Sequence, residues 1–167
     1  ELGDRAAARR LLEQEVRTSK TPHYYLSDLA DLAEAEGSRG EALRLFEQAY
    51  AKARGPASRF QWGALYVQAL LRLAPDEATR IETATLAVLA ELDGRDRLYT
   101  RSRVRLVRLD AGLREWADAK PAAPAVLAKL RQRMQPICRR YPATDPAHGV
   151  CEGFLAAGSA NVRSTTG

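Results

Sequence analysis

The sequence predicts an all-α protein on three grounds. The 167 residues include 30 Ala, 22 Leu and 22 Arg against 8 Val and 2 Ile, and such unbranched residues favour helices over strands. Gly and Pro residues divide the chain into blocks of helical length, and apolar residues recur every three or four positions within each block. We therefore expect about seven or eight helices of roughly 10 to 20 residues.

Length and composition limit the organisation of the chain. Hydrophobic residues make up 46% and charged residues 28%, which excludes an intrinsically disordered chain. No apolar run approaches the ~20 residues of a membrane span. We expect one helical domain over residues 1–157 and a flexible tail over 158–167. Because the chain lacks an initiator Met and a signal segment, we interpret it as a piece of a longer protein.

The first half of the chain predicts five helices. Asp4 is the expected cap of the first, Pro22 opens the second and Gly37 ends it. Ser58 and Asp76 are the expected caps of the fourth and fifth. The five expected ranges are 4–17, 22–36, 41–54, 58–74 and 76–93.

The second half predicts three more helices, over 96–117, 124–140 and 147–155. Asp96 is the expected start of the first of these, and Pro136 must end or kink the second because proline lacks an amide N–H. Asp145 and Pro146 form a cap and first-turn pair for the last. The 96–117 helix carries an apolar seam that we expect to be packed: Tyr99, Ser102, Leu106, Leu109, Leu113 and Trp116.

Residues 22–56 resemble a tetratricopeptide repeat (TPR). The matching positions are small residues at close helix contacts, a turn glycine and an aromatic: Leu29, Ala30, Gly37, Ala42, Phe46 and Ala49. The segment departs from the family pattern at Ala33, where an aromatic is usual, and at Arg54, since the closing proline comes only at Pro56. The resemblance implies a TPR-like stack of antiparallel helical hairpins, an α-solenoid with a right-handed superhelical twist.

A second resemblance concerns the whole chain. The runs over 21–30 and 55–63, together with Cys138 and Cys151, are similar to the helical C-terminal region of bacterial, envelope-located thioredoxin-family proteins. This resemblance implies export to the periplasm or beyond and a structural or partner-recruiting role. The chain has no Cys-x-x-Cys motif, so no catalytic residue is carried over.

Cys138 and Cys151 are the only cysteines. If the helices on either side of 141–146 fold back on each other, the two thiols can meet in a structural disulfide, which an exported location favours. Two free buried thiols, or a redox-active or metal-binding pair, are the alternatives. His148 lies three residues before Cys151, but a metal site there lacks a fourth ligand, and we expect no metal and no cofactor.

No motif in the chain indicates catalysis. It contains no Gly-rich phosphate loop, no Gly-x-Ser-x-Gly and no His-Glu-x-x-His. Its paired carboxylates lie at helix starts or on polar faces, where the helix dipole and solubility explain them. We expect no enzymatic activity within this chain.

Positive charge is concentrated over residues 97–140, which hold 12 Lys and Arg against 3 Asp and Glu, whereas the rest of the chain is net negative. Helical spacing places four arginines on one side of the 96–117 helix, opposite its seam: Arg97, Arg101, Arg105 and Arg108. This stripe is either a solvated face or a site for an acidic protein, a lipid headgroup or nucleic acid. Interleaved exposed aromatics, which nucleic-acid binding favours, are not expected here, because Tyr99 and Trp116 belong to the seam.

Five aromatic residues form a second candidate surface: Tyr24, Tyr25, Phe60, Trp62 and Tyr66. They lie on the first helices of two hairpins, the helices that line the peptide-binding face of TPR-like stacks. The alternative is that they pack between hairpins.

These observations predict a non-catalytic protein-interaction or structural module of an exported, thioredoxin-related protein. One alternative is a thiol redox accessory using Cys138 and Cys151. Another is an Arg-rich helical binder of nucleic acid or acidic partners. A protein or peptide is the expected partner, and a cytoplasmic location stays open.

Overall fold

The computed structural model describes residues 2–94 and 97–156, and over these residues it contains eight helices and no strand. The helices are α1 (Leu2–Thr18), α2 (Pro22–Ala35), α3 (Arg39–Lys52), α4 (Pro56–Leu73), α5 (Ala78–Ala90), α6 (Thr100–Asp118), α7 (Ala123–Cys138) and α8 (Pro146–Gly153). The all-α prediction is confirmed. The predicted tail over 158–167 lies outside the described residues.

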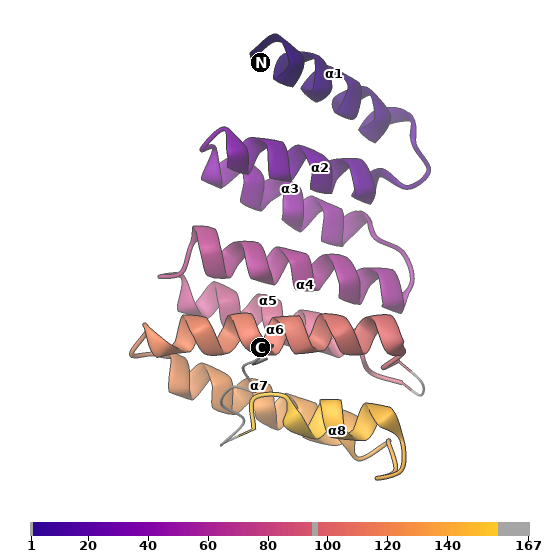
Figure 1. Cartoon of the computed structure of the whole chain (residues 1–167), viewed down its shortest axis with the longest axis vertical. Coiled ribbons are helices and arrows are strands. Elements are labelled where there is room, and N and C mark those ends of the chain that lie inside the picture. The colour runs from indigo at the N-terminus through magenta and orange to yellow at the C-terminus, as the bar shows by residue number, and fades with distance from the viewer. Residues whose placement is uncertain (1, 95–96, 157–167) are drawn as a thin grey trace, which may run out of the picture.

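The helices succeed one another along the long axis of the molecule, from α1 at one end to α7 and α8 at the other (Figure 1). Each of α1 to α4 packs against the next helix in the chain, α7 contacts both α5 and α6, and α8 contacts α6 and α7. Helix α4 also packs directly against α6. Two helices from separate hairpins therefore lie side by side, and the candidate site lies between them.

The seam of α6 forms part of the main core. Ser102, Leu106, Leu109, Leu113 and Trp116 are all buried, as their spacing predicts. Tyr99, the first residue of the predicted seam, is instead 47% exposed. It is the N-cap of α6 and has extended backbone angles, so helical spacing does not apply to it.

Two predicted caps in the first half of the chain are wrong. Helix α1 already includes Leu2, which places Asp4 inside its first turn. Helix α4 begins at Pro56 rather than at Ser58. Gly55 precedes it with a φ of +78°, a left-handed conformation that glycine adopts easily, and the fixed φ of proline suits the first helical position.

The predicted start of the fifth helix at Asp76 is also wrong. Helix α5 begins at Ala78 with Glu77 as its N-cap. The Asp76 carboxylate instead accepts a hydrogen bond from Lys120 Nζ at 2.5 Å, beyond the end of α6. Asp96, the expected start of the next helix, lies outside the described residues. Helix α6 begins later, at Thr100.

The C-terminal helices follow the prediction more closely. Pro136 lies within α7, which ends two residues later at Cys138. The Asp145 side chain accepts a hydrogen bond from the Ala147 amide at 2.7 Å, which confirms the predicted cap of α8. After α8, the Leu155 amide donates to Asp110 Oδ1 on α6 at 2.6 Å. This hydrogen bond joins the segment that follows α8 to α6.

Candidate functional site

A basic groove lies between the N-terminal halves of α4 and α6. Two adjoining pockets share Gln61, Arg101 and Arg105 among their lining residues. We define the basic groove by six residues, two from α4 and four from α6 and its N-cap: Ser58, Gln61, Tyr99, Arg101, Arg105 and Arg108. The three arginines stand at positions i, i+4 and i+7 of one helix, so they share a face.

The arginines of the basic groove have no carboxylate partner among the residues that the structure describes. Among residues 2–94 and 97–156, no Asp or Glu carboxylate lies within ion-pair distance of Arg101, Arg105 or Arg108. Arg105 is half-buried, and its pKa is lowered first by burial and then by the positive charge of Arg108. A bound anion would relieve this repulsion and supply the missing hydrogen-bond acceptors.

The fourth arginine of the predicted stripe does not join the basic groove. Arg97 precedes α6, and its backbone amide donates to the Tyr141 hydroxyl at 3.2 Å. Its side chain lies back against Gly94, and its Nε is buried without a hydrogen-bond partner among the described residues. The prediction that Arg97 shares a helical face with the other three is wrong, because the helix starts three residues later.

Three other arginines of the positive segment are paired. Arg133, on α7, donates to the Asp93 carboxylate, and Arg140 lies 3.6 Å from the other oxygen of that group. Arg114 forms an ion pair of 2.9 Å with Asp110 one turn away on α6. These three arginines each have a carboxylate partner, unlike the arginines of the basic groove.

Three of the five predicted surface aromatics are buried. Phe60, Trp62 and Tyr66 are 1%, 7% and 4% exposed, so they present little surface to a partner and fit the packing alternative. Tyr25 is partly buried and Tyr24 is 52% exposed. The spacing rule placed these residues on the correct helices, but three of them point into the contact between hairpins.

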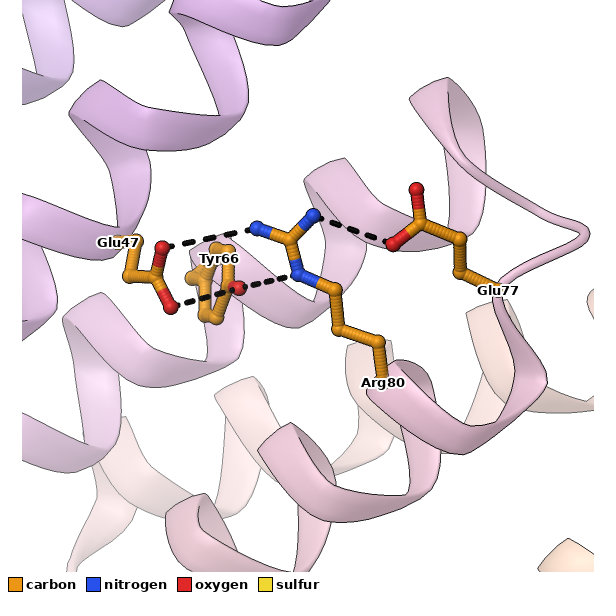
Figure 2. Close-up of polar contacts among 4 residues, drawn as sticks. All are labelled: Glu47, Tyr66, Glu77 and Arg80. Carbon is orange, nitrogen blue, oxygen red and sulfur yellow. Dashed lines mark hydrogen bonds and ion pairs between the residues drawn. The ribbon is translucent and has the colours of Figure 1, made fainter.

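A polar cluster holds Tyr66 in place (Figure 2). The Tyr66 hydroxyl donates to Glu47 on α3 at 3.1 Å and accepts from Arg80 Nε on α5 at 3.0 Å. Arg80 also pairs with Glu77, the N-cap of α5, at 3.1 Å. Burial is the main cause of the raised Tyr66 pKa. This cluster joins α3, α4 and α5 and commits the Tyr66 hydroxyl proton to Glu47.

A similar cluster joins the same three helices at the other end of α5. Tyr50 on α3 and Arg59 on α4 both donate to Glu91 Oε1, at 2.9 and 2.7 Å. The Arg59 guanidinium lies over the Tyr50 ring, 4.7 Å from its centre. Burial, followed by the bond to Glu91, raises the pKa of Tyr50 to about 12. Tyr50 therefore stays neutral at physiological pH and acts as a donor within the helix contact.

An aromatic cluster surrounds His23 near the start of α2. The His23 ring centre lies 4.6 Å from that of Tyr24 and 5.4 Å from that of Trp62. His23 is 7% exposed, and its Nδ1 has no hydrogen-bond partner within the described residues. Burial lowers its pKa. The aromatic surroundings of His23 favour the neutral form of its ring. We therefore interpret His23 as a packing residue.

Cys138 and Cys151 form a disulfide that joins the end of α7 to α8, with Cα atoms 5.4 Å apart. The two residues are only 2% and 1% exposed. An attacking thiolate must reach one of the sulfurs, so burial argues against exchange with a partner. This geometry fits a structural disulfide.

Over the described residues, no group of three or more His, Cys, Asp and Glu side chains is placed to hold a metal ion. His148, considered above as a ligand, instead has its Nδ1 2.9 Å from the Tyr141 carbonyl oxygen. Within the same part of the chain, no helix is both long and apolar enough to cross a bilayer.

The contribution of α4 to the basic groove is absent from the sequence-based predictions. Gln61 and Gln68 are partly exposed positions on a mostly apolar helix, and their seven-residue separation puts them on one face. This polar stripe was the available signal for a surface along α4. The exposure of Tyr99 has no comparable signal, because it depends on where α6 begins.

Comparison of the chain with protein-family models, with curated proteins and with solved structures finds no match.

Proposed function

We propose that this chain is a non-catalytic protein-interaction module that binds an acidic peptide segment in the basic groove. The observation that carries the proposal is the set of three neighbouring arginines without a carboxylate partner in the described part of the chain, one of them half-buried. Burying a cation beside like charges is unfavourable unless an anion completes the site. The resemblance to TPR stacks, which bind peptides along their first helices, supports this location.

The dimensions of the basic groove favour a peptide over nucleic acid. Arg101 and Arg108 are seven residues apart on α6, a rise of about 10 Å. This length matches about three residues of an extended peptide. Val104, 49% exposed, lies between the arginines and provides an apolar contact that a phosphate backbone would not use. Tyr99 supplies one exposed aromatic, fewer than a stacking platform for successive bases needs.

We further propose that the module belongs to an exported, thioredoxin-related protein. The disulfide supports export, and the relation to thioredoxin-family proteins rests on the sequence resemblance alone. Disulfides persist in oxidising compartments and are rare in the cytosol. A cytoplasmic scaffold is the competing proposal, and it requires that the two cysteines be reduced in the cell.

The proposal is tested by fluorescence polarisation with a short labelled peptide containing three consecutive glutamates. We expect Arg105→Gln to weaken binding about tenfold, the typical effect of losing one charge-assisted hydrogen bond. Arg131→Gln is the matched control, because Arg131 is an exposed arginine on α7 outside the basic groove. Its effect should stay below about twofold.

Two results would contradict the proposal. The first is an equal loss of affinity in both variants, which would indicate non-specific attraction to a positive protein. The second is a clear preference for DNA or RNA over the acidic peptide, with affinity falling steeply as salt rises, which would establish the nucleic-acid alternative.

A further inference from the structure

A second pocket lies between the same two helices, at their C-terminal ends. Leu71 and Pro75 line it from α4 and the residues that follow, and Gly112 and Trp116 line it from α6. The Trp116 indole Nε1 donates to the Pro75 carbonyl at 2.8 Å, which fixes the indole at the edge of the pocket. We call this site the Trp116 pocket.

The Trp116 pocket and the basic groove lie on one face of the α4 and α6 pair. Gln61 and Arg105 share the basic groove, Gln68 and Gly112 share the Trp116 pocket, and both pairs are separated by 44 residues. The two helices therefore run alongside each other in constant register. On α6, the step from Arg105 to Gly112 is seven residues, or about two turns, which keeps both on one side.

The two ends of this face differ in charge. The cations at the Trp116 pocket are paired, Arg72 with Glu34 at 2.8 Å and Lys120 with Asp76 at 2.5 Å. The remaining lining is mostly apolar, and its polar members are Gln68 and the exposed carboxylate Glu115. The basic groove instead holds arginines that have no carboxylate partner among the described residues. One end therefore suits an anion and the other suits an apolar side chain.

We infer that the ligand is an extended peptide carrying an acidic cluster and, about five residues away, one large apolar side chain that enters the Trp116 pocket. This inference rests on the proposed function. The spacing follows from the helix: Arg105 and Trp116 are eleven residues apart, a distance of about 16 Å along α6. An extended peptide covers this distance in about five residues.

Gly112 keeps the Trp116 pocket open. It lies in the interior of α6, where glycine is unfavourable compared with alanine. A Cβ atom at this position would lie 3.3 Å from Leu71 Cδ1, so a larger side chain would fill the space between the helices. A methionine here is therefore expected to block the pocket without touching the arginines.

The test uses labelled peptides that hold three glutamates and a single leucine, with Gly-Ser spacers of increasing length and in both chain directions. We expect the affinity to peak when leucine stands about five residues from the glutamates, and to exceed that of the leucine-free peptide about tenfold. Gly112→Met should abolish this gain and leave binding of the leucine-free peptide unchanged. Gly40→Met is the control, because Gly40 lies in α3 with open space around it.

A second readout does not depend on the folding of Gly112→Met. The chain has two tryptophans, so Trp62→Phe leaves Trp116 as the only one. Its emission should shift when the peptide with leucine binds and stay constant with the leucine-free peptide. If affinity does not depend on leucine at any spacing while the glutamates still bind, the inference is overturned and the proposed function stands. If no acidic peptide binds, both are overturned.

Discussion

Gly63 is the position where adding one methyl group should harm the fold most clearly. It lies in α4, buried against α5 and α3. A Cβ atom built on Gly63 would come within 2.5 Å of Val88 Cγ2 and within 3.1 Å of Tyr50 Cε2. Gly63→Ala therefore requires the Val88 side chain or one of these helices to move.

The size of the effect follows from two opposing terms. Alanine is favoured over glycine in a helix interior by about 1 kcal/mol. Overpacking a core costs about 1–3 kcal/mol, and the upper end applies here because Val88 is fully buried and a β-branched side chain in a helix has one strongly preferred rotamer. We expect Gly63→Ala to lower the free energy of unfolding by about 2 kcal/mol, which lowers Tm by roughly 4–8 °C.

Gly40→Ala is the matched control. Gly40 lies in α3, is exposed, and has no atom within 4 Å of an added Cβ, so only the helix preference acts. This variant should be more stable than the parent by about 0.5–1 kcal/mol. Thermal unfolding followed by circular dichroism at 222 nm measures both. If Gly63→Ala is stabilised as much as Gly40→Ala, the close packing of α4 on α5 described above is refuted.

Four further predictions follow from the structure. Replacing Cys138 and Cys151 by serine should lower stability by about 3 kcal/mol for a loop of this length and lower Tm by roughly 6–12 °C; an unchanged Tm would argue that the bond does not form. Stability should fall as pH drops below His23's ordinary pKa of 6.5, because burial lowers the pKa of folded His23 and the unfolded chain binds the proton more tightly; urea unfolding of His23→Phe should lack this dependence. As the pH rises from 10 to about 12, the free energy of unfolding should fall, because Tyr50 ionises at a lower pH in the unfolded chain than in the folded one. Tyr50→Phe should reduce this loss of stability. Arg105→Met should raise Tm by a few degrees while weakening peptide binding, since it removes a half-buried charge beside Arg108; a lower Tm would show that the charge is satisfied in the free protein.

The number of helices and the buried side of α6 could be predicted from local sequence, because each helix has an apolar side that faces the core. The spacing from Ser102 to Trp116 gave the buried side of α6, and Pro22 and Asp145 marked helix starts. Local signals were less reliable where two of them compete. Ser58 and Asp76 are good caps, but Pro56 and Ala78 begin the helices instead.

The basic groove could be predicted only in part. Three arginines on α6 were evident from spacing, since that is a property of one helix. Their lack of carboxylate partners within the described residues depends on which helices come close in space, and the proximity of α4 to α6 is a tertiary feature. The same limit explains Trp62 and Tyr66, because the side of α4 that faces other hairpins is set by those neighbours.

The order of helix contacts has a consequence for folding kinetics. In the described part of the chain, the substantial contacts join helices that are one or two apart in sequence. Contacts between nearby segments close short loops, and proteins rich in them fold in microseconds to milliseconds. Each hairpin should thus be able to pack onto the preceding one soon after its own residues are available. A chain of this kind is well suited to folding progressively while it is still being synthesised.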